Sequence, residues 1–347
     1  MRVIEVYGGS GIGGASQHLR LVLPRLAAAG AEITLLSLPP HALEVDVPTV
    51  RCVGVRDAAA RIRQERGAVV HSHGLKANLS AYLAEPPRLV RTVHSFLADD
   101  YPNPWRRRLV EAFDALARPR VKAFITPSEA LRQDLLRRGV ALQRVSVVPH
   151  GIPEPEPPYG RPDLLSACGF DPVARLVLVA ARLEPVKGVD LAIGALSHLG
   201  PEWALVVFGE GSRRQELEAQ VAACGLSERV RLLGFRPDAR RFFAAADVVL
   251  IPSRQESIGL VAIEAMALGS RLVATAVGGM PETVGPAGLL ATPGDPAALA
   301  AAIVQAHARK DLPSIARRRF EDHFSIDLCV QKTMSILRNI SEQGGLS

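Results

Sequence analysis

Cysteine is scarce in this sequence, and long apolar runs are absent. Four cysteines are spread along the chain without any C-x-x-C pair, at Cys52, Cys168, Cys224 and Cys329. Neither a zinc site nor a disulfide framework is therefore indicated. No stretch holds the roughly 18 uninterrupted apolar residues of a membrane span, and residues 1–2 lead straight into a strand pattern rather than a signal-peptide core. We therefore expect a cytoplasmic protein.

Charge is nearly balanced, and nucleic-acid motifs are lacking. The 41 basic and 35 acidic residues give a net charge of +6, which favours anionic partners without naming one. No basic stretch is interleaved with aromatic residues, so nucleic acid is not an expected partner. With 48% hydrophobic residues over 347 positions, the composition is that of a globular chain long enough for two domains.

Short apolar runs alternate with helical patterns through both halves of the chain. They lie at 3–7, 33–38, 68–71, 89–93, 123–126 and 145–149, and again at 176–180, 204–208, 230–233, 248–251 and 271–275. Such alternation predicts right-handed parallel crossovers. Between the halves, the four prolines of 150–158 fit neither a helix nor a central strand. We predict an α/β protein with doubly wound parallel-sheet domains at 1–152 and 153–325, and a helix at 326–347 that packs back across their junction.

A glycine-rich turn follows the first apolar run. Gly9, Gly11 and Gly14 match G-x-G-x-x-G between a strand and a helix, as a dinucleotide site requires. Such a site also needs an acidic residue after the next strand, where residues 39–41 are two prolines and a histidine. A dehydrogenase is therefore disfavoured. Two interpretations of the turn remain. Its glycines let the backbone approach an anionic ligand at a helix N-terminus, or the turn only connects the strand tightly to the helix and binds nothing.

Two cations follow the first strand of the second half. Arg182 and Lys187 stand just beyond the run 176–180, at the sheet edge where open parallel sheets bind ligands. A planar guanidinium and a mobile ammonium together suit a diphosphate. A surface pair without a role is the alternative.

Two carboxylates flank the predicted start of a later helix. Glu256 precedes this helix, and Glu264 lies about one turn inside it between the apolar Ile263 and Ala265. Both acids would accept hydrogen bonds from hydroxyl groups, beside free helix amides that can bind phosphate. A capping charge and a solvated glutamate are the alternative, but an acid in so apolar a helix favours a functional role.

Taken in order, these motifs resemble glycosyltransferase family 4, the group 1 glycosyltransferases, which have the GT-B fold of two facing Rossmann-like domains. The resemblance covers nearly the whole chain. It rests on the glycine-rich turn, Thr-Val-His at 92–94, Thr-Pro-Ser-Glu at 126–129, residues 147–152, Arg182 with Lys187, residues 208–211, Glu256 with Glu264, and residues 278–282.

The resemblance implies a retaining hexosyl- or glycosyltransferase. It would move a sugar from a UDP-, GDP- or ADP-sugar to the hydroxyl of a glycan or lipid-linked acceptor, in the synthesis of cell-surface glycan, lipopolysaccharide or glycolipid. The first domain would face the acceptor and the second would hold the donor. Arg182 and Lys187 would bind the diphosphate, Glu264 the ribose and Glu256 the sugar. Further donor contacts would come from Gly13, Gly14, Ser257, Ile258, Gly259, Leu260 and Val261.

Two histidines complete the implied site. His94 would contact the donor sugar or the acceptor hydroxyl as a catalytic residue, with a satisfied core histidine as the alternative, and His73 is a weaker candidate on the acceptor side. Relatives usually carry Asn and Asp where His150 and Pro153 stand, so no ligand contact is assigned there. Ser257 replaces the Gly of some relatives, which affects the choice of donor without identifying it.

No cofactor or metal is expected. The two cations and the absence of a D-x-D pattern indicate that protein charge assists departure of the diphosphate. Two alternatives stay open. A nucleotide-sugar epimerase of the same fold would turn over the donor without an acceptor, and a non-catalytic nucleotide-sugar-binding protein would bind the donor without turnover.

Residues 103–116 predict a basic amphipathic helix. Asn103 suits the N-cap and Pro104 the first helical position. An apolar stripe lies beside Arg106, Arg107 and Arg108, and consists of Trp105, Leu109, Phe113 and Leu116. Either this stripe packs on the domain's own sheet, or the basic segment 104–122 rests on anionic lipid at the inner face of the cell membrane, near a lipid-linked acceptor.

Overall fold

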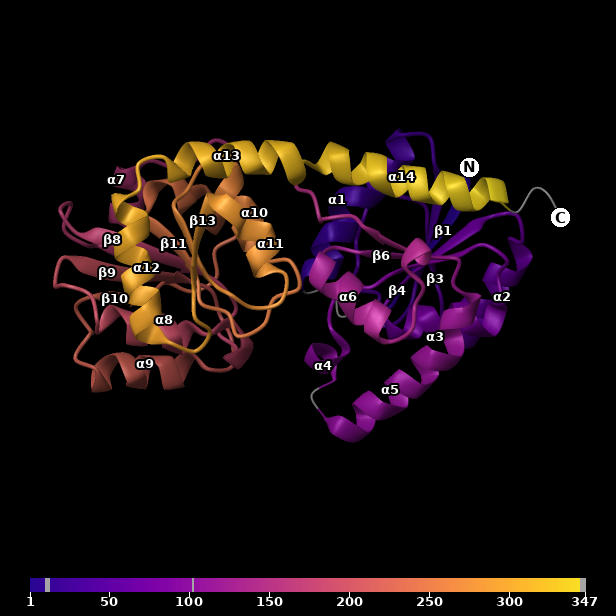
Figure 1. The fold of residues 1–347 in the computed structure, drawn as a ribbon, viewed down its shortest axis with the longest axis horizontal. Coiled ribbons are helices and arrows are strands. Elements are labelled where there is room, and N and C mark those ends of the chain that lie inside the picture. The colour runs from indigo at the N-terminus through magenta and orange to yellow at the C-terminus, as the bar shows by residue number, and fades with distance from the viewer. Residues whose placement is uncertain (10–12, 102, 344–347) are drawn as a thin grey trace. The chain divides into compact units, whose positions relative to one another are not determined.

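The computed structural model describes residues 1–9, 13–101 and 103–343. Its contacts divide the chain into two compact units. The first unit comprises Met1–Pro153 together with the chain from Ser325 onward, and the second comprises Glu154–Phe324. Each unit is built on one parallel sheet flanked by helices (Figure 1). The prediction of two doubly wound α/β halves is confirmed.

The first unit contains a seven-stranded sheet in the order β3-β2-β1-β4-β5-β6-β7. Helices cover both faces of this sheet, as is usual for parallel sheets, and β1 and β2 are mostly buried. Chain order reverses between β1 and β4, which lie side by side in the middle. The strands are β1 (Arg2–Tyr7), β2 (Glu32–Ser37), β3 (Thr49–Arg51), β4 (Val69–His73), β5 (Leu89–Thr92), β6 (Ala123–Thr126) and β7 (Val145–Val147).

Helices form two hydrophobic cores on the two faces of this sheet. On one face α1 and α14 pack against Val3, Val69 and Val90, and on the other face α2 and α3 pack against Val6 and Val70. The helices are α1 (Gly14–Ala28), α2 (Val55–Gln64), α3 (Leu75–Ala84), α4 (Leu97–Asp100), α5 (Pro104–Ala117), α6 (Glu129–Arg137) and α14 (Ile326–Gln343). The last helix therefore contributes to the core of the first unit; residues 344–347 of the predicted C-terminal helix lie outside the described residues.

The second unit contains a six-stranded sheet in the order β10-β9-β8-β11-β12-β13. Here the chain order reverses between β8 and β11. The strands are β8 (Arg175–Ala180), β9 (Trp203–Phe208), β10 (Val230–Leu232), β11 (Val248–Ile251), β12 (Leu272–Thr275) and β13 (Gly288–Ala291). The helices are α7 (Arg161–Cys168), α8 (Val189–Leu196), α9 (Arg214–Ala223), α10 (Leu260–Ala267), α11 (Met280–Val284), α12 (Pro296–Ala308) and α13 (Leu312–His323).

The chain leaves the first unit and returns to it at one place. Ile152 forms a parallel bridge with Ser325, and Ile326 donates its backbone N–H to the carbonyl of Ile152 at 2.9 Å. A Cβ at Gly151 would lie 2.5 Å from the carbonyl oxygen of Ser325, so the approach requires glycine. Among the described helices, none has the length and hydropathy to span a bilayer.

Candidate functional site

In each sheet the chain order reverses at one pair of neighbouring strands, β1 with β4 and β8 with β11. Open parallel sheets bind ligands at the carboxyl ends of such strands. The principal predicted site residues of each unit lie on or just after strands of its sheet. They form two clusters, one in each unit.

The cluster in the second unit centres on an ion pair. The ammonium of Lys187, after β8, lies 2.5 Å from Oε1 of Glu256, after β11. Ser253 Oγ donates to the same oxygen at 2.9 Å. The two loops are joined directly, since the backbone N–H of Arg254 donates to the carbonyl of Val186 at 2.8 Å. The structure thus brings together two residues that the sequence predicted separately.

Two features hold the Lys187 loop in place. Gly188 has φ 65°, and a Cβ there would lie 2.0 Å from the carbonyl oxygen of Pro252, so only glycine allows this contact. Asp190 accepts hydrogen bonds from both terminal nitrogens of Arg254, at 2.8 and 2.6 Å, and from Arg213 at 3.1 Å. Burial alone would raise the pKa of Asp190, but these arginines hold it below its usual value. The sequence prediction missed Asp190, although it follows the Lys-Gly pair closely.

Helix α10 begins beside this pair. Gly259 has φ 71°, and a Cβ there would lie 2.3 Å from the sulfur of Met280. The first amides of a helix have no acceptor within the helix. Glu264 lies half-buried on α10, and Arg182 is exposed directly after β8. The remaining predicted donor contacts form the turn into α10 and its first residues: Ser257, Ile258, Gly259, Leu260 and Val261.

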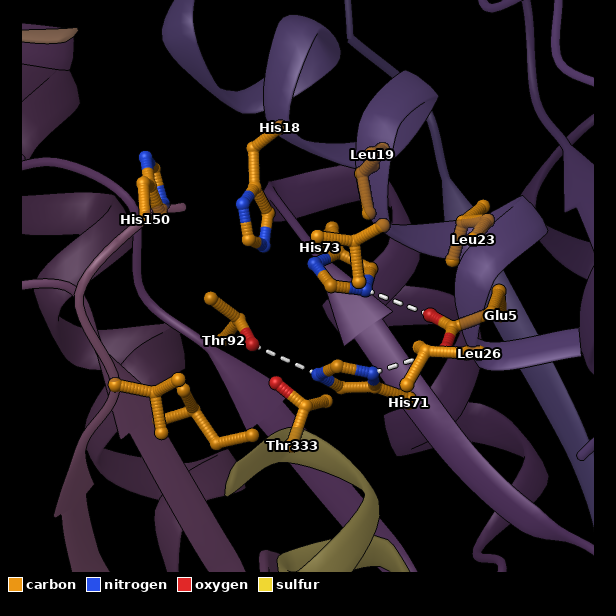
Figure 2. A pocket seen from close by; sticks show the side chains of 13 residues that line it. Glu5, His18, Leu19, Leu23, Leu26, His71, His73, Thr92, His150 and Thr333 are labelled. Atoms are coloured by element: carbon orange, nitrogen blue, oxygen red, sulfur yellow. Dashed lines mark hydrogen bonds and ion pairs between the residues drawn. The ribbon is translucent and has the colours of Figure 1, made fainter. Parts of the chain in front are cut away.

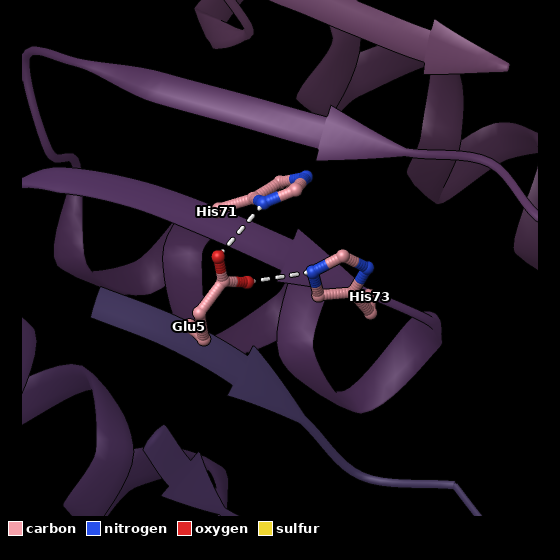
Figure 3. Close-up of side chains that lie close together, drawn as sticks. All are labelled: Glu5, His71 and His73. Atoms are coloured by element: carbon pink, nitrogen blue, oxygen red, sulfur yellow. Dashed lines mark hydrogen bonds and ion pairs between the residues drawn. The ribbon is translucent and has the colours of Figure 1, made fainter. Parts of the chain in front are cut away.

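The cluster in the first unit centres on a buried carboxylate (Figure 3). Glu5 on β1 pairs in register with His71 on β4, and His73 lies two residues further along β4, on the same face. The carboxylate accepts from His71 Nδ1 at 3.1 Å and from His73 Nε2 at 2.8 Å. His71 Nε2 also lies 2.7 Å from the hydroxyl of Thr92 on β5. All four side chains are buried.

Further histidines extend this cluster (Figure 2). His73 Nδ1 lies 3.0 Å from Nε2 of His94, and His94 Nδ1 lies 3.3 Å from Nε2 of His150. His18 of α1 stacks on His150 with ring centroids 4.1 Å apart. Glu5, His18, His73 and His150 line a small pocket of about 10 Å³. We call Glu5 with the five histidines His18, His71, His73, His94 and His150 the histidine cluster.

The charges of this cluster follow from its burial. Burial would raise the pKa of Glu5, but His71 and His73 lower it to about 2. Burial lowers the pKa of His73 to about 4. It also holds the pKa well below the usual range in His18, His94 and His150. At neutral pH the side chains of His18, His73, His94 and His150 are therefore neutral and Glu5 is ionised.

Such groups are also metal ligands. Glu5, His71 and His73 each offer one ligand atom, and these atoms lie within 4.8 Å of one another. A carboxylate with two imidazoles is a set that binds zinc. The sequence prediction of no metal site considered cysteine and D-x-D patterns. It did not consider this set.

The predicted glycines of the first unit begin helix α1. Gly13 has φ 117° and its carbonyl accepts from Ser16 Oγ at 2.9 Å, while Gly14 is the first helical residue. Gly11 of the glycine pattern lies outside the described residues.

The sequence prediction missed four members of the histidine cluster: Glu5, His18, His71 and His150. Glu5 is a single acid within an apolar strand, and His18 follows two polar residues at the start of α1. His71 received no role of its own, and His150 was assigned no ligand contact. The available signal was the alternation of His71 and His73, which places both on one face of a strand.

Two family models match the chain. The model described as Glycosyltransferase Family 4 matches residues 12–154. The model described as Glycosyl transferases group 1 matches residues 167–321.

Similar proteins carry corresponding names. A D-inositol 3-phosphate glycosyltransferase of Xylanimonas cellulosilytica is 36% identical over 271 residues, which cover 68% of this chain and 62% of that relative. The match thus spans less than two thirds of the relative's length. A protein of the same name from Acidothermus cellulolyticus is 32% identical over 360 residues, covering 86% of this chain and 79% of the relative. Among solved structures, Anabaena HepE in complex with UDP-glucose has a TM-score of 0.80 and 25% identity, covering 98% of this chain and 100% of that one.

Proposed function

Because this chain belongs to the group 1 glycosyltransferases of family 4, we propose that it is a retaining, metal-independent enzyme. It transfers a sugar from a nucleoside-diphosphate sugar to an acceptor hydroxyl in the synthesis of a cell-surface glycan, lipopolysaccharide or glycolipid. The observation that carries the proposal is the contact of Lys187 with Glu256 at 2.5 Å. It lies where chain order reverses between β8 and β11, the usual ligand position of such sheets.

The pair suits both parts of the donor. Lys187 has three N–H donors, so its contact with Glu256 leaves donors for a diphosphate. In the described part of the chain, the side-chain bonds of Glu256 come from Lys187 and Ser253 and both fall on Oε1. Its Oε2 then accepts from sugar hydroxyls. Arg182 supplies a second positive charge, which binds the diphosphate leaving group.

The transfer step is a substitution at the anomeric carbon. The acceptor oxygen forms its bond to this carbon on the face from which the diphosphate departs. The bond from the carbon to the phosphate oxygen breaks with its electron pair, and a leaving phosphate oxygen takes the acceptor's proton. Lys187 and Arg182 stabilise the negative charge that develops on the diphosphate.

The names of similar proteins indicate the first substrates to test. UDP-glucose is the ligand in Anabaena HepE, so UDP-sugars precede GDP- and ADP-sugars as donors. D-Inositol 3-phosphate is the acceptor named for both curated relatives. Lipid-linked saccharides form the second acceptor class.

The test follows product and donor together. Each donor is first screened by thermal shift, then incubated with each acceptor, and the anomeric configuration of the product is read by NMR. We expect an unchanged configuration, and equal rates with and without EDTA. Donor turnover without acceptor would instead identify an epimerase. Binding without any turnover would identify a non-catalytic binding protein.

We further propose that the protein contacts a membrane through helix α5. The side chain of Asn103 accepts from the N–H groups of Trp105 and Arg106, both at 3.1 Å. Trp105, Leu109 and Leu116 are 74%, 73% and 68% exposed, so most of the predicted apolar stripe does not pack on the sheet. Phe113 differs from the other residues of the stripe because it is half-buried. Its ring packs edge-on against the ring of Tyr82, with the two ring centroids 5.5 Å apart.

Charge beside the stripe favours anionic lipid. Arg106 and Arg108 are exposed, and such cations each contribute about 1 kcal/mol near an anionic surface. Arg118 and Arg120, further along the basic segment, form ion pairs with Asp114 and Glu85 within the unit. The contact surface is therefore the start of α5 rather than all of 104–122. We place it at the inner face of the cell membrane.

Vesicle flotation tests this contact. We expect binding to anionic but not to neutral vesicles, weakened by salt and abolished by Arg106→Ser with Arg108→Ser. A matched control, Arg56→Ser with Arg61→Ser, removes the same charge from exposed positions of α2 and should float like the wild type. Absence of binding at low salt, or equal loss in the control, would contradict a specific contact through α5.

A further inference from the structure

A continuous series of hydrogen bonds joins Glu5 to three histidines. Glu5 Oε2 lies 2.8 Å from His73 Nε2, His73 Nδ1 lies 3.0 Å from His94 Nε2, and His94 Nδ1 lies 3.3 Å from His150 Nε2. Glu5, His73 and His150 are buried, with exposed fractions of 0%, 1% and 3%. We call this series the imidazole relay.

One carboxylate decides the direction of every bond in the relay. An ionised carboxylate only accepts, so His73 must donate through Nε2. A neutral imidazole has one N–H, so Nδ1 of His73 is an acceptor and His94 must donate to it through Nε2. By the same step His94 Nδ1 accepts from Nε2 of His150. The free lone pair then falls on His150 Nδ1, which has no partner among the described residues.

We propose that Glu5 is a positioning residue which, through His73, fixes the tautomer of His94 with the proton on Nε2. Nδ1 of His94 is then a hydrogen-bond acceptor, and it receives a hydroxyl of the sugar donor or of the acceptor. The contact of Nδ1 with His150 is the longest in the relay, at 3.3 Å, and a substrate hydroxyl replaces it. The inference rests on the proposed function, in which His94 meets substrate.

The opposite tautomers would accompany a bound metal ion. A metal held by Glu5, His71 and His73 would occupy Nε2 of His73 and place its proton on Nδ1, pointing at His94. His94 Nε2 would then have to accept. The relay and the metal site are therefore mutually exclusive, and one measurement separates them.

Nitrogen-15 NMR of the histidine rings in the full chain, without substrate, reads the tautomers directly. At neutral pH we expect His73, His94 and His150 all to carry the proton on Nε2. A proton on Nδ1 of His94, or a doubly protonated ring, would overturn the proposal. So would a stoichiometric metal by elemental analysis of the purified protein, or added Zn²⁺ shifting the His71 and His73 signals.

Glu5→Leu removes the acceptor while keeping a side chain of similar size. We expect His94 to lose its single tautomer, and kcat to fall by about 2- to 12-fold, the contribution of one hydrogen bond to a substrate hydroxyl, with nucleotide affinity unchanged. The matched control is Thr92→Val, which removes the hydroxyl bonded to His71 from the same buried cluster but lies off the relay. It should preserve both the tautomer and kcat, and equal losses in the two variants would indicate a merely structural role. If Glu5→Leu does not fold, the wild-type spectrum still decides the tautomer.

The two proposals fail separately. If the wild-type spectrum shows the expected tautomers but no donor is transferred, the proposed function fails while the tautomer assignment stands. If sugar is transferred but His94 carries its proton on Nδ1, the relay fails alone.

Discussion

At the scale of single residues, the ion pair of the second unit joins side chains 69 positions apart in sequence. Lys187 is 24% and Glu256 15% exposed. A partly solvated pair of this kind contributes little to stability, so its position at the reversal of the sheet indicates a role in binding.

The first prediction concerns the charges on the diphosphate. Lys187→Ala and Arg182→Ala should each lower kcat/KM by about 10- to 150-fold, since a charged hydrogen bond is worth about 1.5–3 kcal/mol. Thermal stability should change little. The control is Arg175→Ala, at the opposite end of β8, where an exposed pair with Glu202 is lost instead. Transfer at the wild-type rate by both variants would show that the diphosphate binds elsewhere.

The second prediction separates the two carboxylates. Glu264→Gln should weaken binding of free nucleoside diphosphate, because its proposed partner is the ribose. Glu256→Gln should leave that binding intact and lower kcat, because its proposed partner is the sugar. Titration calorimetry with the nucleotide, paired with rates of transfer, distinguishes them. The reverse pattern would exchange the two roles.

Residue types were easier to predict than their contacts. Arg182, Lys187 and Glu256 were found because each follows an apolar strand. Their pairing depends on β8 and β11 being neighbours, which no local pattern encodes. Glu5 was missed because an isolated acid within an apolar strand has no partner nearby in sequence, and its partners stand 66 and 68 residues away.

At the scale of elements, the loops that carry the site depend on particular glycines. Gly188 and Gly169 have almost the same backbone conformation, with φ 65° and 68°. They differ in their surroundings. A Cβ at Gly188 would lie 2.0 Å from a backbone carbonyl oxygen, whereas a Cβ at Gly169 would meet nothing within 4 Å.

The third prediction uses this matched pair. Gly169→Ala should lower the free energy of unfolding by about 1 kcal/mol through backbone strain alone. Gly188→Ala should cost about 1–3 kcal/mol more, because the structure must open around the added methyl group, and it should also weaken donor binding by displacing Lys187. Urea unfolding and nucleotide titration measure the two effects. Equal costs would mean that the loop adapts without strain.

The ends of the apolar strands were predicted to within two residues, because buried parallel strands are apolar along much of their length. The short edge strands β3 (Thr49–Arg51) and β13 (Gly288–Ala291) were not predicted. Edge strands bury fewer side chains, and β3 has no buried residue. Helix α5 shows the same limit: its amphipathic pattern was clear, but the pattern alone did not decide between burial and the observed exposure.

At the scale of the whole molecule, the two units place charge differently at the reversal of their sheets. The second unit presents a partly exposed ion pair, and Arg182, which follows the same strand β8 as Lys187, is also exposed. The first unit buries one carboxylate among neutral imidazoles. A buried neutral histidine makes stability depend on pH, so the two units should respond differently to acid.

The last prediction is that acid unfolds the first unit before the second. The folded state keeps His73 neutral down to a pKa of about 4, whereas its unfolded value is 6.5, so below pH 6.5 the unfolded chain binds more protons. Stability therefore falls as pH drops from about 6.5 towards 4, by about 1 kcal/mol per pH unit for each such group. His18, His94 and His150 add to this slope in the same direction. Glu5 adds a further loss between its unfolded value of 4.5 and about 2.

Scanning calorimetry across this range should show one transition that moves steeply with pH and a second that moves less. Replacing His150 with Asn removes one buried titrating ring and should flatten the slope of the first transition. His198→Asn changes an exposed histidine of the second unit and should leave that slope unchanged, because this residue lies outside the histidine cluster. A first transition that keeps its midpoint between pH 7 and pH 5 would mean that these imidazoles gain protons without unfolding, and that the histidine cluster is charged in the native protein.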